Sequence, residues 1–502
     1  MALVEKSPLV RWREALWPIK SYELKKILPL LFMKFFISFT YGVLTTMKDA
    51  FVVTAKGSGA EVIPILKGWV VLPVALGTTL LFSKLSNVFR RSVIFYGTVL
   101  FFMAFIFLYG FVLYPNLEFL SPHQSADLLL QKLGAHNAHW VAIYRNWIPA
   151  VFFVTAELWG QVVIFLLFWG FVNHICNFNE AKRCYNLFIV GGDLAQIFTG
   201  PLVCYFTGKY VGEHFGTGLQ MLVCSILFFG FMILFLYWLL TKKILKSDER
   251  LYSPEQSDVP LEIKTKLSLM ESIKCIIRSP YLRCLAVMVV AYGLTMSLTE
   301  ITWKANLKLA YPDTGAYQAF MATVSSSVGI CSFIITLFFS GVIIRFFGWH
   351  FSAQLPPIVI GSTSLLFLLF FLNPEWLAPL SHFFGMTPIV LIVFFGAFQN
   401  VSSKVMKYAF FDATKEMSFI PLDQESKVKG KAAIDVIGSR LGKSGAAWIQ
   451  IVLIQLAGTG SVLSITHFLL PLIGCTIVFW ILSVRSLNKQ FAIRQPTTSQ
   501  PI

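Results

Sequence analysis

Apolar runs long enough to cross a lipid bilayer recur along the whole chain, separated by short polar segments. A transmembrane helix needs about 20 consecutive apolar residues, and these runs show neither strand alternation nor the polar face of a soluble helix. The pattern predicts an all-α polytopic membrane protein with about twelve transmembrane helices. The runs lie at about 27–47, 62–83, 92–114, 147–173, 184–208, 217–241, 281–303, 318–344, 353–373, 385–411, 431–457 and 461–484.

The longest polar stretch falls near the middle of the chain and divides the runs into two sets of six. We therefore expect two six-helix halves joined by a linker. The predicted segments are an N-terminal segment 1–26, a first half 27–241, a linker 242–280, a second half 281–486 and a tail 487–502.

Lysine and arginine gather in alternate connections. They occur in both terminal segments, in the linker, and around 84–91, 182–183 and 415–431, whereas the connections 374–384 and 458–461 contain none. Because positively charged loops stay in the cytoplasm, the pattern predicts that both termini and the linker are cytoplasmic. The start of the chain has no signal-peptide pattern and no Ser-rich, acid-poor composition typical of a transit peptide. We expect a multi-pass protein of a bacterial cytoplasmic membrane.

The two halves also share short patterns at equivalent places. Tyr41-Gly42 is followed eight residues later by Asp49, and Tyr292-Gly293 eight residues later by Glu300. In the fifth run of each half, a Glu-x-Lys pattern precedes a glycine by about twenty residues. Duplicated six-helix halves are typical of major-facilitator-like transporters, whose substrate site lies between the halves near the middle of the membrane.

Composition and charge narrow the function further. The chain is 56% hydrophobic and 13% charged, far from the balance of a soluble protein. Its net charge of +16 is spread over the loops, so we expect no nucleic-acid partner. The eight cysteines form no C-x-x-C pair and lie mostly in apolar runs, so we predict no disulfide framework, no metal site and no cofactor.

Ionisable residues inside the apolar runs are the candidate functional residues, because a charge in the membrane is costly and marks a functional site by default. For Lys34, Asp49, Lys304 and Asp435, pairing or a place near a span end is an equally good reading. Lys67, Glu157, Glu300 and Lys443 are harder to explain in that way, and Lys443 lies between two glycines that permit close helix packing. The full set is Lys34, Lys48, Asp49, Lys67, Glu157, Asp193, Glu300, Lys304, Asp435, Arg440 and Lys443.

Motifs of soluble enzymes are absent or incomplete. Residues 438–444 (GSRLGKS) are one position short of a P-loop, and no strand precedes them. The eight histidines are dispersed, so a membrane-embedded enzyme acting on a phosphorylated lipid is a remote alternative. We predict a secondary transporter with no catalytic residues.

Several segments together resemble one known family, the nucleotide transporters that include the ATP/ADP translocases of obligate intracellular bacteria and plastids. The resemblance runs from about residue 20 to 490 in one register. The segments that carry it are KD at 48–49, TAKGSGAE at 54–61, ELWG at 157–160, FWG at 168–170, NEAKR at 179–183, TEITWK at 299–304, KEM at 415–417, KVKGKAAID at 427–435 and LGKSG at 441–445.

The resemblance implies nucleotide transport by alternating access, with ATP moving in exchange for ADP. It also implies that Lys67, Glu157, Glu300 and Lys443 are important for transport. One departure points to an alternative: the exchangers carry an Arg-Asp pair just before the Lys-Asp of the first span, where this chain has Thr45-Thr46-Met47. The alternative is proton-driven net import of assorted nucleotides (GTP, UTP, CTP and ATP).

The sequence also suggests how a nucleotide is held. Lysines bind phosphates as point charges, so we expect Lys67 and Lys443, with Lys48 and Arg440, to contact the phosphates. An aromatic side chain is expected to stack on the base, and the candidates are Trp159, Trp169 and Trp303, although core or interfacial positions are more common for tryptophan. In the symport alternative, Glu157 or Glu300 takes up a proton. We expect a monomer in contact with membrane lipid.

Overall fold

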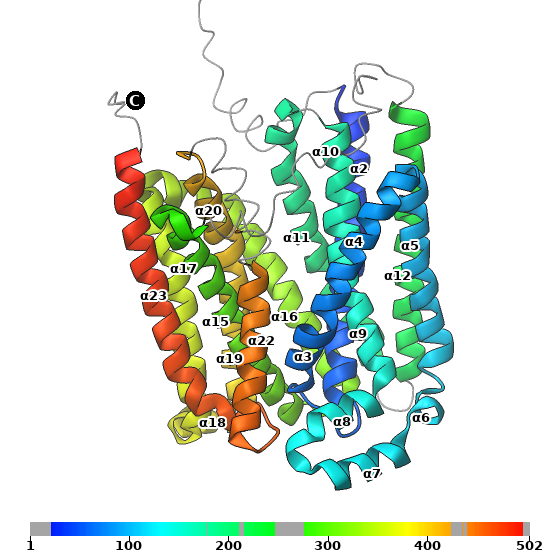
Figure 1. Cartoon of the computed structure of the whole chain (residues 1–502), viewed down its shortest axis with the longest axis vertical. Helices are drawn as coiled ribbons and strands as arrows, with labels where there is room; N and C mark the ends of the chain where they lie inside the picture. Colours follow the sequence, from blue (N-terminus) through cyan, green and yellow to red (C-terminus); the bar gives the residue numbers. More distant parts are fainter. Residues whose placement is uncertain are drawn as a thin grey trace, which may run out of the picture.

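The structure is a computed structural model, and it describes residues 22–176, 178–209, 215–245, 276–422, 434 and 439–494. Within these ranges the chain forms helices and connecting turns (Figure 1). Ten helical runs are long and apolar enough to cross a membrane. This confirms the predicted all-α polytopic fold.

The first six predicted spans agree with helices within a few residues, apart from a first helix that extends well beyond its apolar run. Several spans are composed of an α-helix continued by a π-helical segment. They are α2 (Leu24–Thr54); α3 (Val62–Ile65), η1 (Leu66–Val71) and α4 (Leu72–Val88); α5 (Arg91–Leu108) and η2 (Tyr109–Leu113); α9 (Trp147–Trp159), η4 (Gly160–Phe168) and α10 (Trp169–Ile175); α11 (Phe178–Lys209); and α12 (Phe215–Trp238) with η6 (Leu239–Ile244).

The second set repeats this arrangement. Its elements are α15 (Pro280–Ala310); α16 (Thr314–Ile334) and η8 (Ile335–Ser340); α17 (Gly341–Leu372); α19 (Pro388–Met406), η10 (Lys407–Phe411) and α20 (Asp412–Ser418); α22 (Ser439–Ala457); and α23 (Thr466–Arg494) after η12 (Leu463–Ile465). Most of the predicted linker, 246–275, lies outside the described residues, so its boundaries stay a prediction.

One continuous run contains two of the predicted spans. Thr314–Leu372 is 59 residues long, and Gly348 interrupts it with a φ of 76°, a conformation that glycine adopts readily. The break separates the eighth crossing from the ninth. With this run divided at Gly348, and with the shorter apolar helix Leu441–Ala457 included, the described residues account for all twelve predicted spans.

The two halves pack against each other most closely at one end of the molecule. In Figure 1 the helices of the first half and those of the second lie apart near the C-terminus and together at the opposite end. Helix α11 packs along α16, and α22 packs on α3 and η1. At the packed end, Ala50, Val53, Ile63 and Phe153 join the same buried apolar cluster as Leu298 of the second half. We call this end the closed end.

Polar contacts also cross between the halves at the closed end. The hydroxyl groups of Thr54 and Thr314 are 2.8 Å apart, and the Lys308 ammonium donates to the backbone carbonyl of Ser58. The halves also meet through two aromatic rings: the ring centroids of Trp69 in η1 and Trp448 in α22 lie 4.4 Å apart. The short helices α7 (His123–Leu133), α8 (Ala138–Arg145) and α18 (Ala378–Phe384) lie at the same end (Figure 1).

Candidate functional site

A chain of ion pairs runs between the two halves, and we call it the charge chain. The Lys48 ammonium lies 3.0 Å from Glu157 and 2.9 Å from Asp49. The Lys304 ammonium lies 2.8 Å from the other oxygen of Asp49 and 3.0 Å from Glu300. The order is therefore Glu157–Lys48–Asp49–Lys304–Glu300, and the Asp49–Lys304 pair joins α2 of the first half to α15 of the second.

The middle of the charge chain is buried and its two ends are accessible. The side chains of Lys48, Asp49 and Lys304 are 3%, 1% and 1% exposed, whereas those of Glu157 and Glu300 are 20% and 21% exposed. Buried charges are tolerated when they are paired and hydrogen-bonded. The two outer carboxylates are thus the members of the chain that a ligand can reach without breaking its buried centre.

Glycines in the first helix of each half allow the helices that carry these charges to approach their neighbours. A Cβ atom at Gly42 of α2 would lie 2.8 Å from the Thr199 hydroxyl of α11, and one at Gly293 of α15 would lie 2.9 Å from the Cα of Gly442 in α22. In α15, Glu300 and Lys304 are four residues apart and therefore share a face. The repeated Tyr-Gly pattern thus marks equivalent close-packed positions in the two halves.

Three further lysines surround the charge chain and form no ion pair within the described part of the chain. Lys67 is partly exposed on η1, Lys404 is partly exposed on α19, and Lys443 is exposed on α22. The charge of each interacts with Glu300, and those of Lys67 and Lys443 also with Glu157. The strongest electrostatic attraction of each of these lysines is to one of the two accessible carboxylates of the charge chain, Glu157 or Glu300.

The site as a whole carries more positive than negative charge. Its five described lysines face three carboxylates, which leaves an excess of two positive charges. A site of this kind suits a polyanion, because an anionic ligand supplies the missing counter-charge. The residues counted are Lys48, Lys67, Lys304, Lys404 and Lys443 against Asp49, Glu157 and Glu300.

Two more charge pairs lie within single halves, toward the end opposite the closed one. Lys407 and Asp412 are 2.9 Å apart in the second half. In the first half, the buried Lys34 interacts electrostatically with the buried Asp193. These pairs agree with the prediction that some intramembrane charges, Lys34 among them, balance each other. Asp435 lies outside the described residues.

The structure brings together most of the predicted phosphate ligands. Lys67, Glu157, Glu300, Lys443 and Lys48 all belong to one electrostatic cluster. Arg440 lies in α22, one turn before Lys443, but its side chain is outside the description. Whether these residues bind a nucleotide stays a prediction.

The three tryptophans predicted as stacking candidates lie in packed positions, and their stacking role stays a prediction. Trp159 and Trp303 are fully buried, and their ring N–H groups donate to the backbone carbonyls of Ile37 and Val393 at 3.3 and 3.0 Å. Trp169 is partly buried and packs against Tyr185 and other aromatic rings of the first half. Each of the three therefore packs within its own half, which is the core position noted as the more common alternative from the sequence.

Sequence reasoning missed Lys404, although it lies within the span predicted at 385–411. It is the one lysine of the site that was not among the candidate residues. Lys304 and Asp49 were read as boundary or paired charges. They are indeed paired, but across the two halves, 255 positions apart in sequence.

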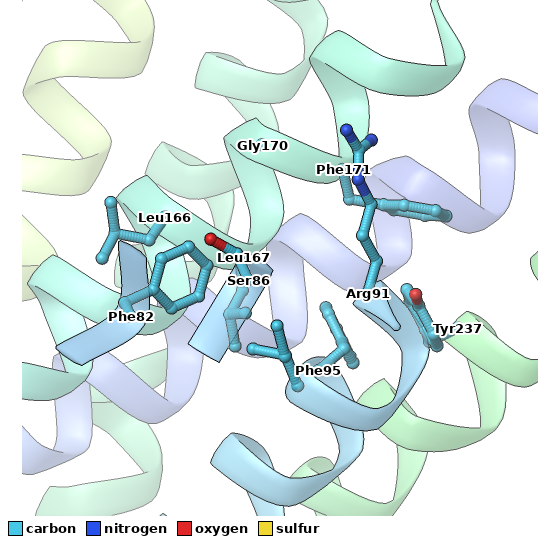
Figure 2. A pocket seen from close by; sticks show the side chains of 10 residues that line it. Phe82, Ser86, Arg91, Phe95, Leu166, Leu167, Gly170, Phe171 and Tyr237 are labelled. Atoms are coloured by element: carbon cyan, nitrogen blue, oxygen red, sulfur yellow. The ribbon is translucent and has the colours of Figure 1, made fainter. Parts of the chain in front are cut away.

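A pocket lies elsewhere, within the first half (Figure 2). It is lined mainly by apolar and aromatic side chains, with Arg91 as the charged group, and Tyr237 and Phe95 stand beside it. None of the charge-chain residues lines it, so this pocket is separate from the charge chain. Among the described residues, no group of three or more His, Cys, Asp or Glu side chains is arranged to hold a metal ion.

Comparisons with known proteins agree with this arrangement. Residues 4–491 match the family model described as TLC ATP/ADP transporter. The chain is 40% identical to "ADP,ATP carrier protein 1" of Chlamydia pneumoniae, with 100% of this chain and 98% of that protein covered. It is 41% identical to "ADP,ATP carrier protein 1, chloroplastic" of Arabidopsis thaliana, with 93% and 74% covered.

The fold is similar to that of solved transporters. The crystal structure of a bacterial homologue of the iron transporter ferroportin, in an inward-facing state, superposes with a TM-score of 0.52 at 13% identity, and 94% of this chain and 98% of that chain are covered. At this identity the likeness concerns the fold alone.

Proposed function

The chain belongs to the TLC ATP/ADP transporter family, and we propose that it exchanges ATP for ADP across a membrane by alternating access between its two halves. Full-length relatives carry the name ADP,ATP carrier protein. The observation that carries the proposal is the position of three lysines, which have no ion-pair partner among the described residues, beside an ion pair that joins the halves. This arrangement couples a polyanion site to the contact that must open.

Phosphates bind at Lys67 and Lys443 in this proposal. Lys67 belongs to the first half and Lys443 to the second, so one polyphosphate that contacts both links the halves. Lysine binds phosphate as a point charge, and the electrostatic attraction is strong where water is excluded. Glu157 and Glu300 act as counter-ions of the empty site, and phosphate oxygens take over that role when nucleotide binds.

The Asp49–Lys304 pair is the gate at the closed end. To open this end, the two side chains must separate, and each then keeps a partner within its own half: Asp49 keeps Lys48, and Lys304 keeps Glu300. An ion pair whose members retain partners after separation avoids leaving an isolated buried charge. The gate is therefore reversible at moderate energetic cost.

The excess positive charge accounts for exchange rather than one-way transport. At the other end, closure brings the lysines of the two halves together without a counter-anion, and like charges in a low-dielectric site repel. Bound ATP or ADP removes this repulsion. Only a loaded carrier then changes conformation readily, so each nucleotide that enters requires one that leaves.

We further propose that both termini face the cytoplasm of a bacterium, because the basic loops lie on that side. The closed end then faces outward. The protein works as a monomer in this proposal, since both halves that form the site belong to one chain.

Proton-driven net import is the second candidate, and it is motivated by the departure from the family pattern that the sequence comparison predicts at Thr45-Thr46-Met47. Two hydroxyl groups lie there, those of Thr45 and Thr46. Their hydroxyls donate to the backbone carbonyls of Tyr41 and Val43 at 2.8 Å. A proton-carrying role for Glu157 or Glu300 requires that the proton displace a lysine 3.0 Å away. This requirement favours exchange over proton coupling.

The test is uptake of labelled ATP into proteoliposomes that are empty or loaded with ADP. We expect uptake only into loaded vesicles, with no effect of a protonophore. The variant Lys443→Gln should lower this uptake at least tenfold through loss of one charge-assisted phosphate contact, whereas Lys132→Gln, on the exposed face of α7, should match wild type. Protonophore-sensitive uptake into empty vesicles would instead support net import.

A further inference from the structure

Helix α19 has a fixed rotation in the second half, because its polar face is tied to neighbouring helices. The Gln399 amide donates to the hydroxyl groups of Thr299 in α15 at 3.2 Å and of Ser364 in α17 at 2.9 Å. On the same side, Gly396 lies against the ring of Trp303. These contacts leave little freedom to turn α19, so the residues beside Gln399 hold defined positions near Glu300.

Lys404 follows on this helix near the middle of the apolar run Pro388–Ser418. Its strongest attractive partner is Glu300, and its charge also acts on Lys443. Glu300 is already held by Lys304 at 3.0 Å, so it does not serve as a dedicated counter-ion for Lys404. The side chain is partly exposed and forms no ion pair with any described residue, an arrangement that leaves its charge available to an anion.

Asn400 lies one helical turn before Lys404, and residues four apart share a face of a helix. Its side chain is 1% exposed, yet neither the amide nitrogen nor the amide oxygen has a hydrogen-bond partner among the described residues. Most buried polar groups are paired, and an exception calls for a partner that completes it. Two groups on one face of α19, a cation and an amide, thus lack partners among the described residues, and the cation lies beside the charge chain.

We propose that Lys404 and Asn400 form a further part of the nucleotide site, in which Lys404 is a third phosphate-binding cation and the Asn400 amide hydrogen-bonds the same nucleotide. This inference rests on the proposed function and deepens it. Lys404 supplies one of the two excess positive charges of the site. A ligand with more phosphate charges therefore gains more from Lys404 than one with few.

The experiment is calorimetric titration of the purified full-length protein in detergent with ATP, ADP and AMP. For Lys404→Gln we expect about tenfold weaker ATP binding, a smaller loss for ADP and little change for AMP. Lys404→Arg, which keeps the charge, should restore most ATP affinity. Lys132→Gln loses the same charge on the exposed face of α7 and should bind all three nucleotides as wild type does.

Asn400→Leu separates ligand binding from a structural role. Removing an unpaired buried amide should leave the melting temperature unchanged or raise it, while ATP binding weakens. A lower melting temperature with unchanged binding would overturn the assignment of Asn400. If Lys404→Gln binds ATP as wild type does, or loses ATP and AMP equally, the assignment of Lys404 is overturned while the proposed function stands. If wild-type protein binds no nucleotide, both are overturned.

Discussion

The two halves of the protein share a fold but contribute unequal charge to the site. In the first half, Lys48 and Lys67 balance Asp49 and Glu157. The second half contributes three lysines (Lys304, Lys404 and Lys443) and one carboxylate, Glu300. The entire excess of positive charge therefore belongs to the second half. We infer that this half holds most of the polyphosphate, while the first half supplies the counter-charges that the moving gate needs.

The close-packed glycines show the same kind of inequality. Gly42 of the first half lies against the Thr199 side chain, whereas Gly293 of the second half lies against the backbone of Gly442, next to Lys443. A side chain can change its rotamer, but a backbone moves only with its helix. The first half is thus the more tolerant of substitution at this contact. The two halves therefore differ from each other at this equivalent contact, close to the site.

The largest expected effect comes from Lys304→Gln, which removes the cation that the second half inserts between Asp49 and Glu300. Loss of one partner from a buried ion pair costs about 3–5 kcal/mol. We expect a large fall in melting temperature and loss of ATP/ADP exchange. Lys48→Gln, the matching change in the first half, keeps the Asp49–Lys304 pair, so its closed end should stay closed.

Labelling of a cysteine at Thr314→Cys with a maleimide reports on the closed end, because Thr314 contacts Thr54 there. Labelling should be faster in the Lys304→Gln background than in the Lys48→Gln background. The double variant Asp49→Asn/Lys304→Gln removes the unbalanced carboxylate and should regain part of the lost stability. Equal labelling in the two single variants would show that Asp49–Lys304 is not the gate.

A medium effect is expected from Gly293→Ala, which places a methyl group 2.9 Å from the Gly442 backbone. Overpacking of this kind costs about 1–3 kcal/mol. Because Lys443 follows Gly442, the variant should also weaken ATP binding. Gly42→Ala meets the Thr199 side chain instead and should cost less than about 1 kcal/mol, with unchanged ATP affinity. Melting curves and titrations of the two variants check the difference, and equal losses would contradict it.

The smallest effect concerns the turns after the first helix of each half. In the second half, Asp313 caps α16 by accepting from the Ala316 N–H at 2.8 Å, so Asp313→Ala should lower the free energy of unfolding by about 1 kcal/mol.

In the first half, Glu61 makes no such cap. Burial raises the pKa of its carboxyl group, although the charge of Lys308 opposes this effect.

A raised carboxyl pKa means that the folded state binds the proton more tightly than the unfolded state does, so stability falls as pH rises through the folded pKa. Glu61→Gln removes this penalty. Its melting temperature relative to wild type should therefore be higher at pH 7 than at pH 4.5. The same difference in melting temperature between Glu61→Gln and wild type at both pH values would contradict the role of Glu61. An unchanged free energy of unfolding in Asp313→Ala would contradict the role of Asp313 as a helix cap.

The fold was largely predictable because bilayer thickness imposes a length on every span. The run predicted at 147–173 appears as Trp147–Ile175, and that at 281–303 as Pro280–Ala310. The longer ends arise because helices continue past the apolar run, as α15 does through Lys308 to Ala310. Hydropathy does not detect where a helix stops once it leaves the membrane.

The site was predictable in kind but not in its pairings. Glu157 and Glu300 stood out because each is a charge in an apolar run, but no spacing indicates that Asp49 meets Lys304 across the two halves. Lys404 has neighbours such as Lys407 that suggest a polar span end, and only the structure shows that Lys407 is paired with Asp412 while Lys404 is not paired within the described chain. Burial of Trp159 and Trp303 likewise depends on packing that sequence does not encode locally.

The excess of fixed lysines also bears on the energetics of the exchange under a membrane potential. The same lysines accompany either cargo, so their charge contributes equally to the inward and outward steps. What remains is the difference between the cargos, because ATP carries about one more negative charge than ADP. A potential of about 100 mV acts on that single charge with about 2.3 kcal/mol. An inside-negative membrane therefore opposes ATP entry against ADP, and the voltage sets the direction in which equal nucleotide pools exchange.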